Sequence, residues 1–260
     1  MYDISYPTIF VVSDFKYIKY LQFFLFFVTK NVTRGQVFVH FINTPQQVID
    51  QIQKQFPIVK GYDKEDKELN TKNINLPHPE FPPFRQSSKM FVNSEIKKFG
   101  KLYSDDVAYC ANIRLKRIAE FLDKTEQDII YIDVDNVVNK DLENLYGLIN
   151  DNDILVVPNL SNHISTTLFY VKNNHKTVNF FKEMSEFVES YLYVWGIDSI
   201  AFNTLLEGKK LKDIILPKEY YDETYNPDSV IWINHLTMYG MTNKYQELID
   251  EIHFRTDSML

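Results

Sequence analysis

The chain has 260 residues, of which 45% are hydrophobic and 24% are charged, enough to bury the core of one large domain over residues 1–260. Its 35 acidic residues outnumber its 28 basic ones, and the net charge of −7 argues against a nucleic-acid partner, because such binding relies on Lys and Arg. The single cysteine, Cys110, excludes an internal disulfide and favours a cytoplasmic location.

The pattern of apolar residues predicts a succession of strands and helices. In chain order these are a strand over 8–14, a helix to about 30, a strand over 36–43, a helix over 44–56, a helix over 104–125, a strand over 129–132, a short helix over 141–149, strands over 153–158 and 166–173, helices over 175–194 and 198–208, and strands over 213–217 and 229–234. The early alternation of strand and helix predicts a parallel sheet, and the short link before 166–173 predicts an antiparallel strand there.

Other segments add local expectations. Thr44 is the expected N-cap of its helix, with Pro45 at the first helical position. Residues 61–88 lack apolar periodicity and are expected to form a long surface loop. The apolar stretch 20–28 is shorter than the roughly 20 residues that span a membrane, and it lacks the flanks of a signal peptide. We therefore expect no transmembrane segment.

Arg114 interrupts the apolar face of the helix predicted over 104–125. Val107 lies seven residues before it and Ile118 four residues after it, so all three share one helical face. A guanidinium group in such a place needs either a partner or a route to solvent. Arg114 is therefore a candidate functional residue.

Two aspartates, Asp133 and Asp135, follow the strand over 129–132. While the chain stays extended, side chains separated by one residue point the same way, so the two carboxylates would share one site. They would raise each other's pKa unless a cation such as Mg²⁺ or Mn²⁺ lay between them. The carboxyl end of a strand suits a ligand site. Alternatively the aspartates only form a turn, with Asp135 and Asn136 closing the strand.

The segment IIYIDVDNVVNKDLENL (129–145) resembles glycosyltransferases of the GT-A fold, particularly family 8, which includes glycogenin-like and bacterial lipopolysaccharide galactosyl- and glucosyltransferases. The helix around Arg114 resembles the preceding helix of that family, where a basic residue reaches toward the nucleotide-sugar. The resemblance implies an α/β GT-A fold, with a Rossmann-like, mostly parallel central sheet flanked by helices and a small antiparallel portion. It also implies a nucleotide-binding half over 1–135 and an acceptor-binding half over 136–260.

The beginning of the chain carries the same resemblance. VVSDFKYIKYL (11–21) is similar to the first strand and loop of the family, which hold the nucleoside. This makes Val12, Ser13, Asp14 and Tyr17 candidate contacts to the base or ribose, although each could equally serve only the structure.

Two further segments lie downstream. WGIDSIAFNTLL (195–206) resembles the helix whose aspartate lies near the transferred sugar, here Asp198, but Ser199 stands where Gln is usual. Asp198 could instead be an ordinary N-cap. NHLTMYGMTNK offers His235 as a metal ligand and Lys244 as a phosphate contact, at wider spacing than the family's His-x-x-Gly-x-x-Lys pattern. His235 could also serve only packing.

The resemblance implies a metal-dependent glycosyltransferase that moves a sugar from a nucleotide-sugar, expected to be UDP-linked, to a glycan or other hydroxyl acceptor, with Mn²⁺ or Mg²⁺ as cofactor. A retaining enzyme would admit the acceptor on the face of the leaving group, whereas an inverting one would need a general base, for which Asp198 is the first candidate. The implied roles are metal binding for Asp133, Asp135 and His235, nucleotide contacts for Asp133, Val134, Asp135, Arg114 and Lys244, and catalysis for Asp198 and Arg114.

Two other functions remain open. Asp-x-Asp-x-Val after an apolar strand is also the opening motif of haloacid-dehalogenase-type phosphatases, in which Asp133 would be the nucleophile and Asp135 the general acid. Against this, the downstream segment LKDIILPKEYYDE does not provide that class's closing pair of acids. The third possibility is a non-catalytic protein that binds sugar nucleotides or glycans.

Overall fold

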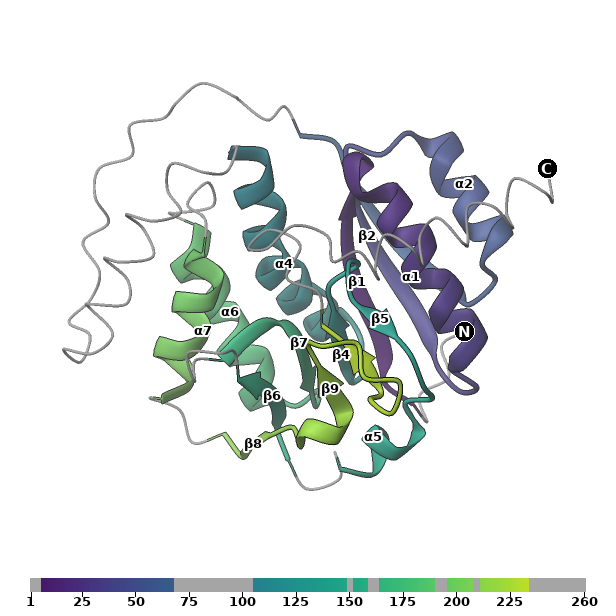
Figure 1. Ribbon diagram of the computed structural model, residues 1–260. Helices are drawn as coiled ribbons and strands as arrows, with labels where there is room; N and C mark the ends of the chain where they lie inside the picture. The colour runs from purple at the N-terminus through teal and green to yellow at the C-terminus, as the bar shows by residue number, and fades with distance from the viewer. Residues whose placement is uncertain are drawn as a thin grey trace.

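The computed structural model describes residues 6–67, 105–148, 152–158, 164–189, 196–207 and 211–233, shown in colour in Figure 1. The helices are α1 (Ile18–Asn31), α2 (Gln46–Gln55), α4 (Asp105–Lys124), α5 (Glu143–Gly147), α6 (His175–Glu189) and α7 (Ile197–Glu207), with short 3₁₀ helices η1 (Phe15–Tyr17) and η2 (Lys218–Tyr220). The strands are β1 (Thr8–Asp14), β2 (Gln36–Ile42), β3 (Val59–Glu65), β4 (Ile129–Ile132), β5 (Val137–Val138), β6 (Ile154–Pro158), β7 (Ile164–Val171), β8 (Asp213–Ile215), β9 (Tyr221–Asp222) and β10 (Ile231–Trp232).

Seven strands form one sheet in the order β3-β2-β1-β4-β7-β6-β8. β1 pairs in parallel with both β2 and β4, whereas β7 runs antiparallel to its neighbours β4 and β6. The chain therefore moves outward from β1 through β2 to β3 and then returns to place β4 on the other side of β1. In open α/β sheets, ligands bind outside the carboxyl ends of the strands where the order reverses in this way.

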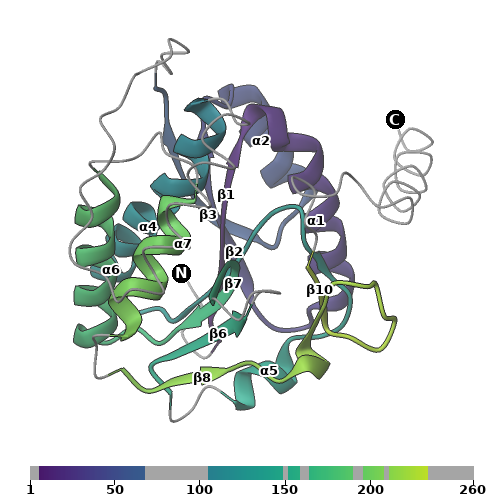
Figure 2. The same cartoon turned by 60° about the vertical axis from the view of Figure 1, so that its left-hand side comes forward.

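Helices cover both faces of the sheet, as Figure 2 shows. Because successive strand side chains point to opposite faces, Ile9 and Val11 of β1 pack with α1 and α2, whereas Phe10 and Val12 pack with α4, α6 and α7. A second sheet of three short strands, in the order β5-β10-β9, lies next to α1. The predicted α/β fold with a mostly parallel sheet and a small antiparallel portion is confirmed.

Part of the predicted loop over 61–88 is a strand. β3 begins at Val59 and pairs in parallel with β2 at the edge of the sheet. Its residues are mostly polar because an edge strand exposes much of its surface, so no apolar periodicity marks it. The remainder of the predicted loop, from residue 68, lies outside the described residues.

Other boundaries differ by a few residues. α2 begins at Gln46, with Pro45 as the N-cap residue, and the Thr44 hydroxyl donates a hydrogen bond to the carbonyl of Ile42 instead of capping the helix. The strand predicted over 229–234 is only Ile231–Trp232, and it belongs to the second sheet. None of the helices in the described ranges has the length and apolar character that crossing a membrane requires.

Candidate active site

Polar side chains from several elements meet at the carboxyl ends of β1 and β4, where the strand order reverses. Asp14 ends β1, Asp133 follows β4, and Arg114 projects from α4. Thr166 lies near the start of β7, and because β7 is antiparallel its first residues reach this same edge of the sheet. Asp198 completes the group from the first turn of α7.

Arg114 connects these elements. Its Nη1 donates to Oδ1 of Asp133 at 2.7 Å and to the Tyr131 hydroxyl at 3.2 Å. Its Nη2 donates to Oγ1 of Thr166 at 2.7 Å and pairs with Oδ2 of Asp198. The side chain is 7% exposed, so the partners offset the cost of burying its charge. Of the two possibilities expected from the sequence, a partner or a route to solvent, Arg114 has partners.

Two hydroxyl groups bind the same carboxylate oxygens that Arg114 binds. The Tyr131 hydroxyl donates to Oδ1 of Asp133 at 2.5 Å, and the Thr166 hydroxyl donates to Oδ2 of Asp198 at 2.9 Å. The Tyr131 ring stacks on Phe169 at a centroid distance of 5.0 Å, which fixes its orientation. Each carboxylate therefore receives two donors on one oxygen.

The chain does not stay extended through the acidic pair. β4 ends at Ile132, and the amide of Asn136 donates to the carbonyl of Asp133 at 3.0 Å, which closes a turn over Val134 and Asp135. The turn interpretation therefore describes the backbone. The two carboxylates still act on each other, since burial and then the charge of Asp133 raise the pKa of Asp135 to about 8.

The first loop lies close to this pair. Asp14 accepts a hydrogen bond from the Tyr17 amide at 2.9 Å and so caps η1, while burial raises its own pKa. Burial and then the charge of Asp135 raise the pKa of Tyr17 to about 12, and the same two causes raise that of Tyr20. Tyr17 therefore interacts electrostatically with Asp135, and Asp14 caps the turn that carries Tyr17.

Three other predicted contacts have buried side chains. Val12 and Val134 belong to the hydrophobic core, and the Ser13 hydroxyl donates to the carbonyl of Asp14 at 3.2 Å. Main-chain atoms are what these positions can offer to a ligand. His235 and Lys244 lie outside the described residues.

Tyr131 and Asn112 were not identified from the sequence. Tyr131 lies two residues before Asp133 at the end of a strand, so alternation could have placed both on the face that α4 covers. Asn112 is fully buried, and its Oδ1 accepts a hydrogen bond from the Asp198 amide at 3.3 Å. No sequence pattern indicates this contact, because it joins two helices 86 residues apart.

The residues present fit part of a divalent-cation site. No group of three His, Cys, Asp or Glu side chains in the described ranges could hold a metal ion. Asp133 and Asp135 supply two neighbouring carboxylates, and burial, followed by the charge of Asp133, raises the pKa of Asp135. Mg²⁺ is often held by one or two carboxylates together with substrate phosphates and water. The pair suits an ion bound in that way.

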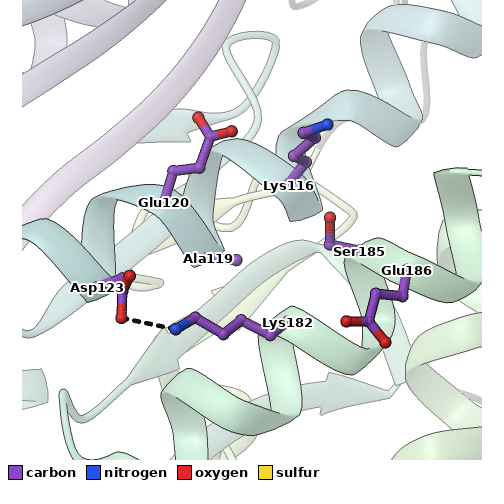
Figure 3. A pocket seen from close by; sticks show the side chains of 7 residues that line it. All are labelled: Lys116, Ala119, Glu120, Asp123, Lys182, Ser185 and Glu186. Carbon is purple, nitrogen blue, oxygen red and sulfur yellow. Dashed lines mark hydrogen bonds and ion pairs between the residues drawn. The ribbon is translucent and has the colours of Figure 1, made fainter.

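A hollow lies between α4 and α6, away from the Arg114 cluster, as Figure 3 shows. Its volume is about 180 Å³, smaller than the roughly 300–1,000 Å³ of small-molecule sites. Charged side chains of both signs line it, and Lys182 pairs with Asp123 across it at 2.7 Å. We interpret it as a solvated groove between two helices.

Comparison with known proteins identifies the fold. No protein-family model matches the sequence, and no curated protein sequence matches it. Among solved structures, the galactosyltransferase LgtC, crystallised with donor and acceptor sugar analogs, is 14% identical, with 94% of this chain and 95% of LgtC covered and a TM-score of 0.57. The chain has a GT-A glycosyltransferase fold.

Two other solved glycosyltransferase structures also match this chain. The glycosyltransferase GlyE of Streptococcus pneumoniae TIGR4 is 12% identical, with 96% of this chain covered and a TM-score of 0.56. The chain spans 64% of the length of GlyE. Mouse xyloside xylosyltransferase 1 is 8% identical, with 89% of this chain and 98% of that protein covered and a TM-score of 0.51. The resemblance expected from the acidic segment is confirmed at the level of the fold.

Proposed function

We propose that this chain is a metal-dependent glycosyltransferase that moves a sugar from a nucleotide-sugar, UDP-linked, to a hydroxyl group of a glycan or other acceptor. The supporting observation is the cluster of Arg114, Asp133 and Asp198, beside Asp135, at the reversal point of a GT-A sheet. Residues 1–135 would bind the nucleotide and residues 136–260 the acceptor. LgtC, which shares the fold, was crystallised with both donor and acceptor sugar analogs.

The chemistry requires control of negative charge. When the bond between sugar and diphosphate breaks, charge grows on the departing phosphate, and fixed positive groups stabilise it. Arg114 provides such a group, since its two nitrogens are held by Asp133 and Asp198 and cannot reorganise freely. Asp133, Asp135 and His235 would hold a divalent cation, which would supply further positive charge to the diphosphate.

Other residues would bind and orient the substrates. Tyr17, which interacts electrostatically with Asp135, would contact the base or ribose, together with Asp14 and the main chain of Val12, Ser13 and Val134. Lys244 would contact a phosphate. Asp198 would hold a hydroxyl of the transferred sugar through Oδ1, because Arg114 and Thr166 already bind its Oδ2.

The phosphatase alternative has less support. The geometry of Asp133 does not favour the phosphatase over the transferase, because Oδ1 accepts hydrogen bonds from Arg114 and Tyr131 and the other oxygen, Oδ2, would serve either chemistry. GlyE and LgtC, which match most of the length of this chain, are glycosyltransferases. No observation favours the phosphatase beyond the tripeptide itself.

The test is release of UDP from UDP-glucose and UDP-galactose with MnCl₂, compared with phosphate release from p-nitrophenyl phosphate with MgCl₂. We expect UDP release, and a loss of about 100-fold or more in Asp135→Asn, because that change removes a charged metal ligand. Asp123→Asn is the matched control, since Asp123 is an exposed aspartate in the α4–α6 groove. Phosphate release alone would overturn the proposal.

Calorimetry distinguishes a glycosyltransferase from a non-catalytic protein that only binds the sugar nucleotide. Titration of UDP with MnCl₂ into the protein reports binding independently of turnover. Binding without hydrolysis or transfer for any acceptor would assign the chain to donor binding alone. Full activity in Asp135→Asn would refute the metal role of that residue.

A further inference from the structure

Arg114 is the centre of two similar arrangements of three groups. On one side, Nη1, the Tyr131 hydroxyl and Oδ1 of Asp133 contact one another at 2.5–3.2 Å. On the other side, Nη2, the Thr166 hydroxyl and Oδ2 of Asp198 form the second group, with Thr166 at 2.7 Å from Nη2 and 2.9 Å from Oδ2. Each nitrogen of the guanidinium group is thus shared by a hydroxyl and a carboxylate.

The arrangement leaves one oxygen of each carboxylate for other partners. Among the residues that the structure describes, no hydrogen bond reaches Oδ2 of Asp133 or Oδ1 of Asp198. The Asp133 side chain is 22% exposed, so it is also accessible from solvent. A carboxylate fixed through one oxygen can rotate little about its last bond. The other oxygen therefore has a defined direction.

The two hydroxyl groups are themselves firmly held. Tyr131 is 2% exposed, stacks on Phe169 with an interplanar angle of 18°, and lies under the Arg114 guanidinium at 5.3 Å from ring centroid to carbon. Thr166 is 6% exposed in β7. Buried hydroxyls on a sheet have few alternative rotamers and so act as rigid donors.

We propose that Tyr131 and Thr166 are positioning residues. Tyr131 binds Oδ1 of Asp133 and so directs Oδ2 of Asp133 toward the metal and diphosphate. Thr166 binds Oδ2 of Asp198 and so directs Oδ1 of Asp198 toward the sugar. This inference rests on the proposed function. The inference assigns different roles to the two aspartates after β4. Asp133 is a one-oxygen ligand with a fixed direction, and Asp135 supplies the more adaptable carboxylate.

The first test compares two buried tyrosines. Tyr131→Phe removes the hydroxyl that binds Asp133. Tyr170→Phe is the matched control, because the Tyr170 hydroxyl also donates to an aspartate, Asp128, at 2.5 Å, but at the opposite end of β4. Both variants lose one buried hydroxyl, and their melting temperatures report the structural cost.

The measurement is isothermal titration of UDP into each protein with and without MnCl₂. Loss of a group that orients a metal ligand typically costs 10–100-fold in affinity. We expect Tyr131→Phe to weaken Mn²⁺-dependent UDP binding about 10-fold, and Tyr170→Phe to stay within about twofold of wild type. Equal losses in the two variants would assign the effect to stability and overturn the inference.

The second variant, Thr166→Val, keeps the shape of the side chain and removes its hydroxyl. UDP lacks the sugar that Asp198 would contact, so we expect its Mn²⁺-dependent affinity to stay within about twofold of wild type. The affinity for UDP-galactose or UDP-glucose, whichever wild type binds more tightly, should fall about 5–10-fold. This variant decides the question if Tyr131→Phe does not fold.

The outcomes separate the two proposals. If wild type binds no UDP with MnCl₂, the proposed function fails and this inference fails with it. If wild type binds UDP and Tyr131→Phe binds it equally well, the inference alone fails. An unchanged ratio of UDP-sugar to UDP affinity in Thr166→Val would likewise overturn it.

Discussion

Helix α4 carries two arginines three residues apart, Arg114 and Arg117, and both pair with acids near the carboxyl ends of strands. Arg117 pairs with Glu65, the last residue of β3, and with Glu120, at 2.7 Å for the latter. The Tyr109 hydroxyl donates to Glu65 at 3.0 Å. The contacts of Arg117 therefore hold α4 against the edge of the sheet. The contacts of Arg114 hold the same helix against the centre of the sheet.

The two clusters differ in how well their acids are satisfied. Burial alone would raise the pKa of Glu65, but His40 and Arg117 together lower it to about 2. Burial and Asp133 instead raise the pKa of Asp135 to about 8. An acid with enough donors stabilises the fold, whereas an excess of neighbouring acids stores a cost that a bound cation can relieve. The comparison distinguishes a cluster that stabilises the fold from the proposed ligand site.

Arg114→Ala should have the largest effect on stability. It leaves Asp133 and Asp198 without their cation in a buried place, which typically costs about 3–5 kcal/mol. Urea denaturation at pH 7 measures the change. Arg117→Ala is the control and should cost about 1–2 kcal/mol, because its side chain is 21% exposed and water can replace part of the contact. Equal losses of stability in Arg114→Ala and Arg117→Ala would contradict the difference between the two clusters.

Asp135→Asn should stabilise the protein without metal. Because the pKa of Asp135 is raised in the folded state, its contribution to stability is present at low pH and is lost as the pH rises from about 4 to about 8. In EDTA at pH 8 we expect the variant to melt higher than wild type by on the order of 5 °C. The difference should shrink at pH 5, as differential scanning calorimetry would show. A lower melting temperature at both pH values would contradict the excess-acid interpretation.

Glu65→Gln should act in the opposite sense with pH. The pKa of Glu65 is lowered in the folded state, so its stabilisation is full above about 4.5 and declines as the pH falls toward about 2. We expect the variant to lose about 1–2 kcal/mol at pH 7 and less at pH 3. Urea titrations at the two pH values measure this. An equal loss of stability at both pH values would show that the charge of Glu65 does not contribute to stability.

Lys182→Ala should have the smallest effect. Lys182 and Asp123 form an ion pair at 2.7 Å, but both side chains are about half exposed. Such pairs contribute about 0–1 kcal/mol, and we expect a change below about 0.5 kcal/mol in urea denaturation. A larger loss would mean that the α4–α6 groove contributes more to stability than a solvated surface does.

The sequence predicted the alternating strands and helices of the sheet well, because their apolar residues recur with clear periods. β3 was missed since an edge strand has no continuous apolar face, and β5 and β9 because two residues carry no period. These elements depend on their neighbours in the fold.

The candidate site was predictable where the residues are close in sequence. Asp133 and Asp135 follow a strand, and Arg114 interrupts an apolar helical face. The roles of Tyr131, Thr166 and Asn112 depend on contacts across the fold, such as the 52 residues between Arg114 and Thr166. A local pattern does not contain such information.

The separation between Arg114 and its partner Asp198, 84 residues along the chain, has a consequence for biosynthesis. Chains are made from the N-terminus, and early segments begin to fold while later ones are still on the ribosome. Arg114 and Asp133 emerge long before α7 is synthesised. Arg114 therefore has only part of its counter-charge until Asp198, 84 residues further along, has been translated.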